Sequence, residues 1–449
     1  MTALQPRMEI PAVQDTQLSF VRSPGFAERA IAVVTMFVYA FSLPNEWFVI
    51  VGENSAGAVQ GGSPITTLAF LSFGGFAVLS LNGNWHLAVN ALGREPLFAV
   101  FVGWVGLSSI WSLNAAETFS AFVLFVIALV ISANFLVRYR LEEILYLCGV
   151  ALAIGIAINF IFIFVFQEFG TDSINVGTDG GSRWSGVFVT KNELGRVAVL
   201  SLIVCGYLTR VRRSRFIWPF WSLLALIQII GSDAGTALGA TFGVFALTAV
   251  MLGFRGRKTL YGATAVAMAT IFSILTLLAA TNLAAATGLL GKDATFTGRA
   301  PLWLNTIQFG IAERPWFGYG WLAFWTEDVA IDVKLRSNFL VPNGHNTFLD
   351  AWLFAGPIAA FLLIAIFLRG FIWGARNIRA VPSAVGLAPV ILISYAFIYS
   401  LAESGVVRRE LSFIVLVVAC STVAQNKGVK VKVEEYRERR AEQTRAGTR

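Results

Sequence analysis

The amino-acid sequence predicts an all-α, polytopic membrane protein with about twelve transmembrane helices, and three observations lead to this fold class. Hydrophobic residues make up 56% of the 449 residues, charged residues make up only 13%, and the mean hydropathy is +0.70. This composition is too apolar for an ordinary soluble globule. Apolar runs long enough to cross a bilayer recur along the chain, and most basic residues lie in connections that would face one side.

The individual spans follow from the length of the apolar runs. A helix needs about 20 predominantly apolar residues to cross about 30 Å of hydrocarbon. Suitable runs lie near residues 30–51, 64–81, 97–113, 118–137, 142–166, 193–209, 216–231, 235–253, 259–281, 346–368, 385–402 and 409–425. The predicted organisation is a cytoplasmic segment over 1–28, a membrane domain over 29–425 with external loops at 167–191 and 281–343, and a basic cytoplasmic tail over 426–449.

Targeting and cysteine usage agree with this organisation. The first 28 residues contain no apolar core of a cleavable signal peptide, so the first span is expected to act as the insertion signal. All three cysteines fall inside predicted spans, which predicts neither a disulfide framework nor a metal cluster. The sequence predicts no cofactor.

Membrane topology explains the positions of most basic residues. With the N-terminus inside, about 24 of the 34 Lys and Arg residues are cytoplasmic, so the formal charge of +8 indicates no nucleic-acid partner. Arg196 is an exception because it lies in the first turn of a span, where an isolated charge costs about 2.5 to 3.5 kcal/mol. It is expected to face a polar cavity. The basic residues expected on the outer side are Arg183, Lys191, Arg196, Lys292, Arg299, Arg314, Lys334, Arg336, Arg408 and Arg409.

The longer external loop is predicted to be ordered. Loops of this length in compact proteins are usually functional or disordered, and its many aromatic residues argue against disorder. Residues 297–311 are expected to form an amphipathic helix along the membrane surface.

Three external segments place polar groups at the start of a helix, namely Lys191-Asn192-Glu193-Leu194-Gly195-Arg196, Thr297-Gly298-Arg299 and Gly344-His345-Asn346. Helix N-termini attract anions, and arginine binds phosphate oxygens bidentately. Brought together, these segments would form a diphosphate site, with His345 as a general base. A capping or interfacial histidine is the alternative, since the neighbouring Asn and Gly residues also suit a turn. His86 is expected at the inner membrane interface.

An ordered set of short motifs resembles the O-antigen ligase and polymerase superfamily. The motifs are Trp184-Ser185-Gly186-Val187-Phe188-Val189-Thr190-Lys191-Asn192-Glu193-Leu194-Gly195, Phe296-Thr297-Gly298-Arg299-Ala300-Pro301-Leu302-Trp303, Arg314-Pro315-Trp316-Phe317-Gly318-Tyr319-Gly320 and Gly344-His345-Asn346-Thr347-Phe348-Leu349. The resemblance implies a GT-C-like fold and a metal-independent, inverting glycosyltransferase. It implies His345 as the catalytic residue. It also implies diphosphate binding by Arg299 and Arg196, with Lys191, Arg183 and Arg314 as further candidates and Asn346, Asn192 and Tyr319 in support.

Within the superfamily, the strings around Lys191, Arg299 and Tyr319 look most similar to the exopolysaccharide polymerase branch. One departure is Thr190, where relatives of that branch often have histidine. The resemblance favours polymerisation of undecaprenyl diphosphate-linked repeat units into exopolysaccharide or O-antigen, with ligation of glycan to lipid A-core as the alternative. It implies a bacterial inner membrane location, cytoplasmic termini and a periplasmic active site. Candidate partners are the lipid-linked oligosaccharide, membrane lipids, a chain-length regulator and polysaccharide export proteins.

Two alternative functions, neither of them enzymatic, stay open. One is a transporter of lipid-linked oligosaccharide, although transporters usually show internal repeats and none is visible in this sequence. The other is a structural partner in polysaccharide export, for which a change at His345 would not affect turnover.

Overall fold

The computed structural model describes residues 24–43, 64–171, 183–212, 216–253, 299–337, 343–380, 384–408 and 410–424. Within these ranges the regular structure is helical, apart from an isolated antiparallel bridge between Thr171 and Trp184. The all-α prediction is therefore confirmed. The elements are α1 (Phe26–Phe41), α4 (Pro64–Ser80), α5 (Trp85–Gly93), α6 (Leu97–Leu107), α7 (Ala115–Arg138), α8 (Leu141–Phe164), α9 (Gln167–Gly170), α10 (Lys191–Val211), α11 (Ile217–Gly231), α12 (Gly235–Gly253), α14 (Arg299–Asn305), α15 (Val329–Ser337), α16 (Thr347–Ala380), α17 (Ala384–Ala402) and a last helix, Leu411–Ala424. Short 3-10 turns at Ser108–Ile110 and Phe324–Thr326 and a π-helix at Thr306–Ile311 complete the set.

Each predicted apolar run overlaps a helix, except the run at 259–281, which lies outside the described residues, as does the run at 30–51 beyond residue 43. The short helices α5, α9, α14 and α15 lie outside the predicted runs. Within the described ranges, four helices, α7, α8, α10 and α16, are long and apolar enough to cross a membrane. The bent pair α4 and α5, at 111°, would make a fifth span. The same ranges contain five shorter apolar helices. The protein is thus a multi-pass membrane protein, and the number of twelve spans stays a prediction, as do the predicted domain limits.

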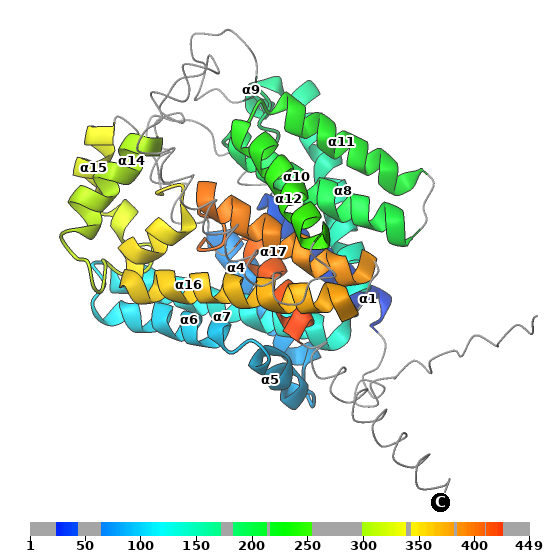
Figure 1. Cartoon of the computed structure of the whole chain (residues 1–449), viewed down its shortest axis with the longest axis horizontal. Helices are drawn as coiled ribbons and strands as arrows, with labels where there is room; N and C mark the ends of the chain where they lie inside the picture. The colour runs from blue at the N-terminus through cyan, green and yellow to red at the C-terminus, as the bar shows by residue number, and fades with distance from the viewer. Residues whose placement is uncertain are drawn as a thin grey trace, which may run out of the picture.

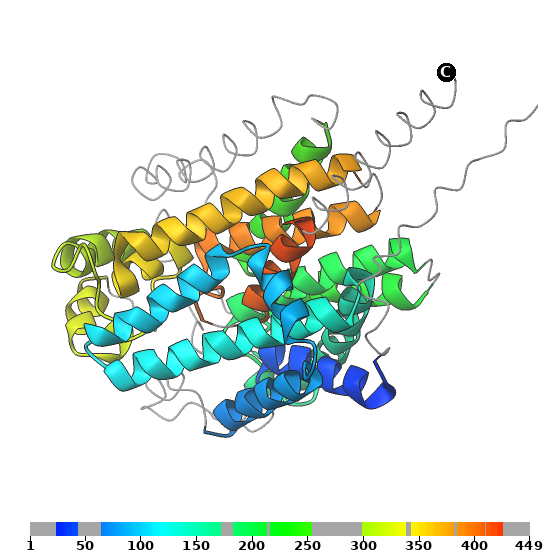
Figure 2. The same ribbon diagram turned by 90° about the horizontal axis from the view of Figure 1, so that it is seen from below.

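The long helix α16 organises the bundle. It runs along the long axis of the molecule, with α14 and α15 gathered at one end of that axis (Figures 1 and 2). Helices α6 and α17 pack along it, and α10 packs against α8, α11, α12 and α17. This arrangement places residues 299–337, named the external segment after their predicted location, beside the N-terminus of α16.

Helix α16 is broken near its first third, and the external segment fills the break. Gly356 has a φ of +76° and precedes Pro357, which has no N–H to donate to the carbonyl of Leu353. Tyr319 N donates to that oxygen at 3.1 Å, and Gly320 N donates to Phe354 O at 2.9 Å. The carbonyl groups at the break are therefore satisfied by the backbone of residues 319–320 in the external segment.

The external segment is ordered by burial of its aromatic side chains. Trp321, Phe324 and Trp325 are at most 2% exposed and join the main core. The helix expected over 297–311 corresponds to α14 followed by the π-helix, with Thr297 and Gly298 outside the described residues. Its position along the membrane surface stays a prediction. The three cysteines are buried within helices that correspond to predicted spans.

Candidate functional site

His345 lies in a tight turn that begins α16. Its φ of +49° is uncommon for a residue other than glycine, and the backbone N–H of His345 donates to Asn343 Oδ1 at 2.9 Å. Asn346 caps the helix, since its Oδ1 accepts from the N–H groups of Phe348 and Leu349 at 3.0 Å. Trp303 Nε1 donates to Gly344 O at 2.8 Å. The turn thus fixes the histidine and ties it to α14.

Glu403, directly after α17, connects His345 to Arg299. Its Oε2 lies 2.8 Å from His345 Nδ1, and its Oε1 accepts from Arg299 Nη2 at 2.6 Å. Arg299 also donates to the carbonyl of Ala402. The three side chains are between 7% and 15% exposed. The structure therefore brings together two of the predicted site residues through a carboxylate that the sequence analysis did not include.

Glu403 is an ionised acceptor in this arrangement. Burial alone would raise the pKa of its carboxyl, but the charges of Arg299 and His345 and the hydrogen bond from His345 outweigh burial and hold that pKa well below its usual range. A carboxylate can only accept hydrogen bonds, so the proton of a neutral His345 ring lies on Nδ1. Nε2 is then the basic nitrogen.

Arg196 joins the same cluster from α10. Its Nη1 lies 2.7 Å from Glu410 Oε2, and its charge interacts with Glu403. Arg196 is therefore paired with an acidic residue, and the polar cavity expected around it stays a prediction. Tyr395 OH donates to the backbone carbonyl of Arg196 at 3.2 Å and anchors this turn of α10 to α17.

The turn between α11 and α12 contacts three of the predicted site residues, Arg183, Lys191 and Asn192. Arg183 Nε lies 3.2 Å from Asp233 Oδ2, and Lys191 Nζ donates to Asp233 O at 3.4 Å. Asn192 Oδ1 accepts from Thr236 Oγ1 at 3.2 Å. These contacts form a second polar group at the N-terminus of α10.

Arg314 and Tyr319 have mutual contacts inside the external segment. The Arg314 guanidinium lies 5.0 Å from the centroid of the Tyr319 ring. Tyr319 OH donates to Gly310 O at 2.9 Å, with Glu313 Oε2 at 3.3 Å. Burial, followed by the Glu313 charge, raises the pKa of Tyr319 to about 12. Tyr319 is therefore a neutral donor at physiological pH, and its contacts stabilise the segment.

Sequence reasoning missed three acidic residues at this site: Glu403, Glu410 and Asp350. Asp350 accepts from Gly344 N and Trp325 Nε1, both at 3.0 Å, and from Ser404 Oγ. A signal was available for the two glutamates, because acidic residues at the ends of apolar runs are costly unless they are paired. In the described ranges, no three His, Cys, Asp or Glu side chains are grouped to hold a metal ion.

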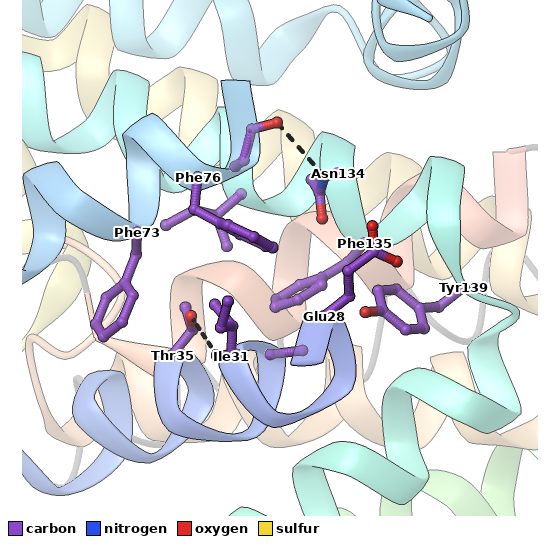
Figure 3. A pocket seen from close by; sticks show the side chains of 11 residues that line it. Glu28, Ile31, Thr35, Phe73, Phe76, Asn134, Phe135 and Tyr139 are labelled. Atoms are coloured by element: carbon purple, nitrogen blue, oxygen red, sulfur yellow. Dashed lines mark hydrogen bonds between the residues drawn. The ribbon is translucent and has the colours of Figure 1, made fainter. Parts of the chain in front are cut away.

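A small cavity lies away from this site. It contains about 250 Å³ of space, part of it open to solvent, between α1, α4 and the C-terminal end of α7, and Glu28, Phe73, Asn134 and Tyr139 are among its lining residues (Figure 3). The other end of α7 contacts the external segment through Asn114 and Glu327. Because 24 helical residues extend about 36 Å, the cavity is not part of the cluster around Glu403.

Acid should destabilise the folded protein through Glu403. Its pKa is depressed in the folded state, so an unfolded chain takes up a proton near pH 4 that the folded chain still excludes. The stabilisation is complete at neutral pH and should fall as the pH drops below about 5. Thermal unfolding of the detergent-solubilised protein between pH 3 and pH 7 would test this. A Glu403→Gln variant with the same acid dependence as the native chain would contradict it.

Comparison with known proteins agrees with the motifs. Residues 220–364 match the family model described as O-antigen ligase, a range that includes Arg299 and His345. The exopolysaccharide production protein ExoQ of Rhizobium meliloti (strain 1021) is 26% identical over 238 residues. This match covers 48% of the present chain and 52% of the relative, so the chain spans about half the length of the curated relative it matches. The predicted resemblance is confirmed: the chain is similar to the O-antigen ligase and polymerase superfamily, and within it to a protein of exopolysaccharide production.

Proposed function

We propose that this protein is a membrane glycosyltransferase that joins undecaprenyl diphosphate-linked repeat units into exopolysaccharide or O-antigen. The observation that carries the proposal is the carboxylate of Glu403, which contacts both His345 Nδ1 and Arg299 Nη2. This geometry supports a basic imidazole next to a cationic anion-binding group. The reaction would take place on the periplasmic side of the bacterial inner membrane, in a GT-C-like fold of about twelve spans with cytoplasmic termini.

The reaction is a direct displacement at the anomeric carbon. The acceptor hydroxyl transfers its proton to His345 Nε2 while its oxygen bonds to that carbon. The bond between the carbon and the diphosphate oxygen breaks, and the electron pair leaves with undecaprenyl diphosphate. Attack from the face opposite the leaving group inverts the configuration. Glu403 stabilises the imidazolium, Arg299 and Arg196 stabilise the charge on the diphosphate, and no metal ion takes part.

The acceptor distinguishes the two related activities. A polymerase uses a second lipid-linked unit, whereas a ligase uses lipid A-core. The similarity to an exopolysaccharide production protein favours polymerisation. A chain-length regulator and polysaccharide export proteins are candidate partners.

Turnover by the purified, reconstituted protein would test this function. Undecaprenyl diphosphate-linked repeat unit is supplied as the only sugar, with EDTA present. We expect products of two or more joined units. Consumption of donor only after lipid A-core is added would favour the ligase, and turnover that requires an added divalent metal would overturn the metal-independent mechanism. Transport of labelled donor across the bilayer without glycan transfer would overturn the enzyme assignment.

A further inference from the structure

A cluster of acidic and basic side chains surrounds the proposed diphosphate site. Its described members include three arginines and three glutamates that interact electrostatically, namely Arg196, Arg299, Arg408, Glu193, Glu403 and Glu410. If all six are ionised and His345 is neutral, their charges cancel. A diphosphate would then bind strongly only if one carboxylate moved away from its arginine.

Two of the three carboxylates are held in place by hydrogen bonds. Both oxygens of Glu403 are engaged, one by Arg299 and one by His345. Glu193 belongs to the capping box that begins α10, where its Oε2 accepts from Thr190 N and its own N–H donates to Thr190 Oγ1, both at 3.4 Å. Displacing either carboxylate would also break local structure.

Glu410 is held differently. Its side chain is 24% exposed, compared with 9% for Glu403. Its Oε2 lies 2.7 Å from Arg196 Nη1 but has no aligned hydrogen bond in the described part of the chain. Charge pairs with aligned hydrogen bonds are the stronger kind. The Arg196–Glu410 pair therefore has less geometric support than the pair between Arg299 and Glu403.

Gly405 packs directly against this pair. A Cβ atom at that position would lie 2.8 Å from Glu410 Oε2 and 3.1 Å from Arg196 Nη1. A larger residue would press on both charged groups. The glycine therefore lets the backbone after α17 approach both the guanidinium and the carboxylate closely.

We infer that Glu410 is a resident counter-ion of Arg196 that the diphosphate of the lipid-linked substrate displaces. Glu410 thus weakens binding of the diphosphate and keeps a buried arginine paired while the site is empty, which avoids an uncompensated charge. This inference rests on the proposed function, because it takes the Arg196 side chain as a ligand for the substrate diphosphate.

Equilibrium binding of farnesyl diphosphate to the full chain in lipid nanodiscs would test the inference. The Glu410→Gln variant should bind about 10-fold more tightly than the native chain, because a negative charge close to the ligand has been removed. The matched control, Glu168→Gln, removes an exposed carboxylate from α9 and should bind as the native chain does. The double variant Arg196→Gln/Glu410→Gln should lose the gain.

Equal or weaker binding by folded Glu410→Gln would overturn the counter-ion role. Folding is checked by size-exclusion chromatography and thermal unfolding. The assay is independent of sugar transfer, so tighter binding by Glu410→Gln with no turnover by the native chain would support the counter-ion and overturn only the enzymatic proposal. If neither the native chain nor the variant binds diphosphate, both proposals are overturned.

Discussion

A His345→Ala variant is expected to lose glycan transfer by about 10²- to 10⁴-fold, which is the usual contribution of a positioned general base. His345 Nε2 is the proposed proton acceptor. Asn343 and Asn346 fix the turn at His345, and Glu403 contacts its ring. The loss should appear in kcat more than in KM, because the proton moves only as the transition state forms. Initial rates of repeat-unit joining in proteoliposomes would measure it.

The other histidine in the chain provides the control for this prediction. His86 is exposed in α5, and His86→Ala should retain native turnover. A Glu403→Gln variant should also lose turnover, because it removes the negative charge next to the imidazole. It also leaves Arg299 without its ion-pair partner at a buried position, which costs about 3 to 5 kcal/mol. Folding of that variant must therefore be verified. Equal rates for His345→Ala and His86→Ala would rule out the proposed base.

The second large effect is expected from Gly356→Ala at the break in α16. Gly356 has a φ of +76°, and an added Cβ would lie 1.9 Å from the carbonyl oxygen of Trp316. The obstructing atom belongs to backbone, which cannot rotate away as a side chain can. We expect a destabilisation of about 3 to 5 kcal/mol and a reduced yield of monodisperse protein after detergent extraction. Thermal unfolding of the purified material would measure the loss.

Gly103→Ala is the matched control for this substitution. Gly103 lies in α6, and a Cβ atom there would meet no other atom within 4 Å. Alanine is favoured over glycine inside a helix by about 0.5 to 1 kcal/mol, so this variant should be as stable as the native chain or more so. A Gly356→Ala protein with the same unfolding temperature as the native chain would contradict this prediction. It would show that the contact between α16 and the external segment tolerates a side chain at residue 356.

Much of the helical framework could be predicted from local sequence. The run predicted at 118–137 is α7 (Ala115–Arg138), and the run predicted at 142–166 is α8 (Leu141–Phe164). Both are long and uniformly apolar, and such a stretch has few alternatives to a helix in a membrane. The start of α10 could also be predicted, because Thr190 and Glu193 form a capping box there.

The break in α16 could not be placed with the same reasoning. Pro357 indicates a local interruption, but the groups that satisfy Leu353 O and Phe354 O come from the external segment. Only the packed structure determines that residues 318–320 cross the helix there. The same packing places Arg314 and Tyr319 together at the external segment, while Arg183 and Lys191 meet at Asp233.

The sequence by itself determined the membrane character and the resemblance to the O-antigen ligase and polymerase superfamily, and it predicted His345, Arg299 and Arg196 as site residues. The tertiary structure decided how these residues are paired. Glu403 is 58 residues from His345 and 104 residues from Arg299 along the chain, and no local spacing relates residues so far apart. Apolar length and helix caps act over a few turns, whereas a buried charge is stabilised by whichever opposite charge the fold brings within a few ångströms.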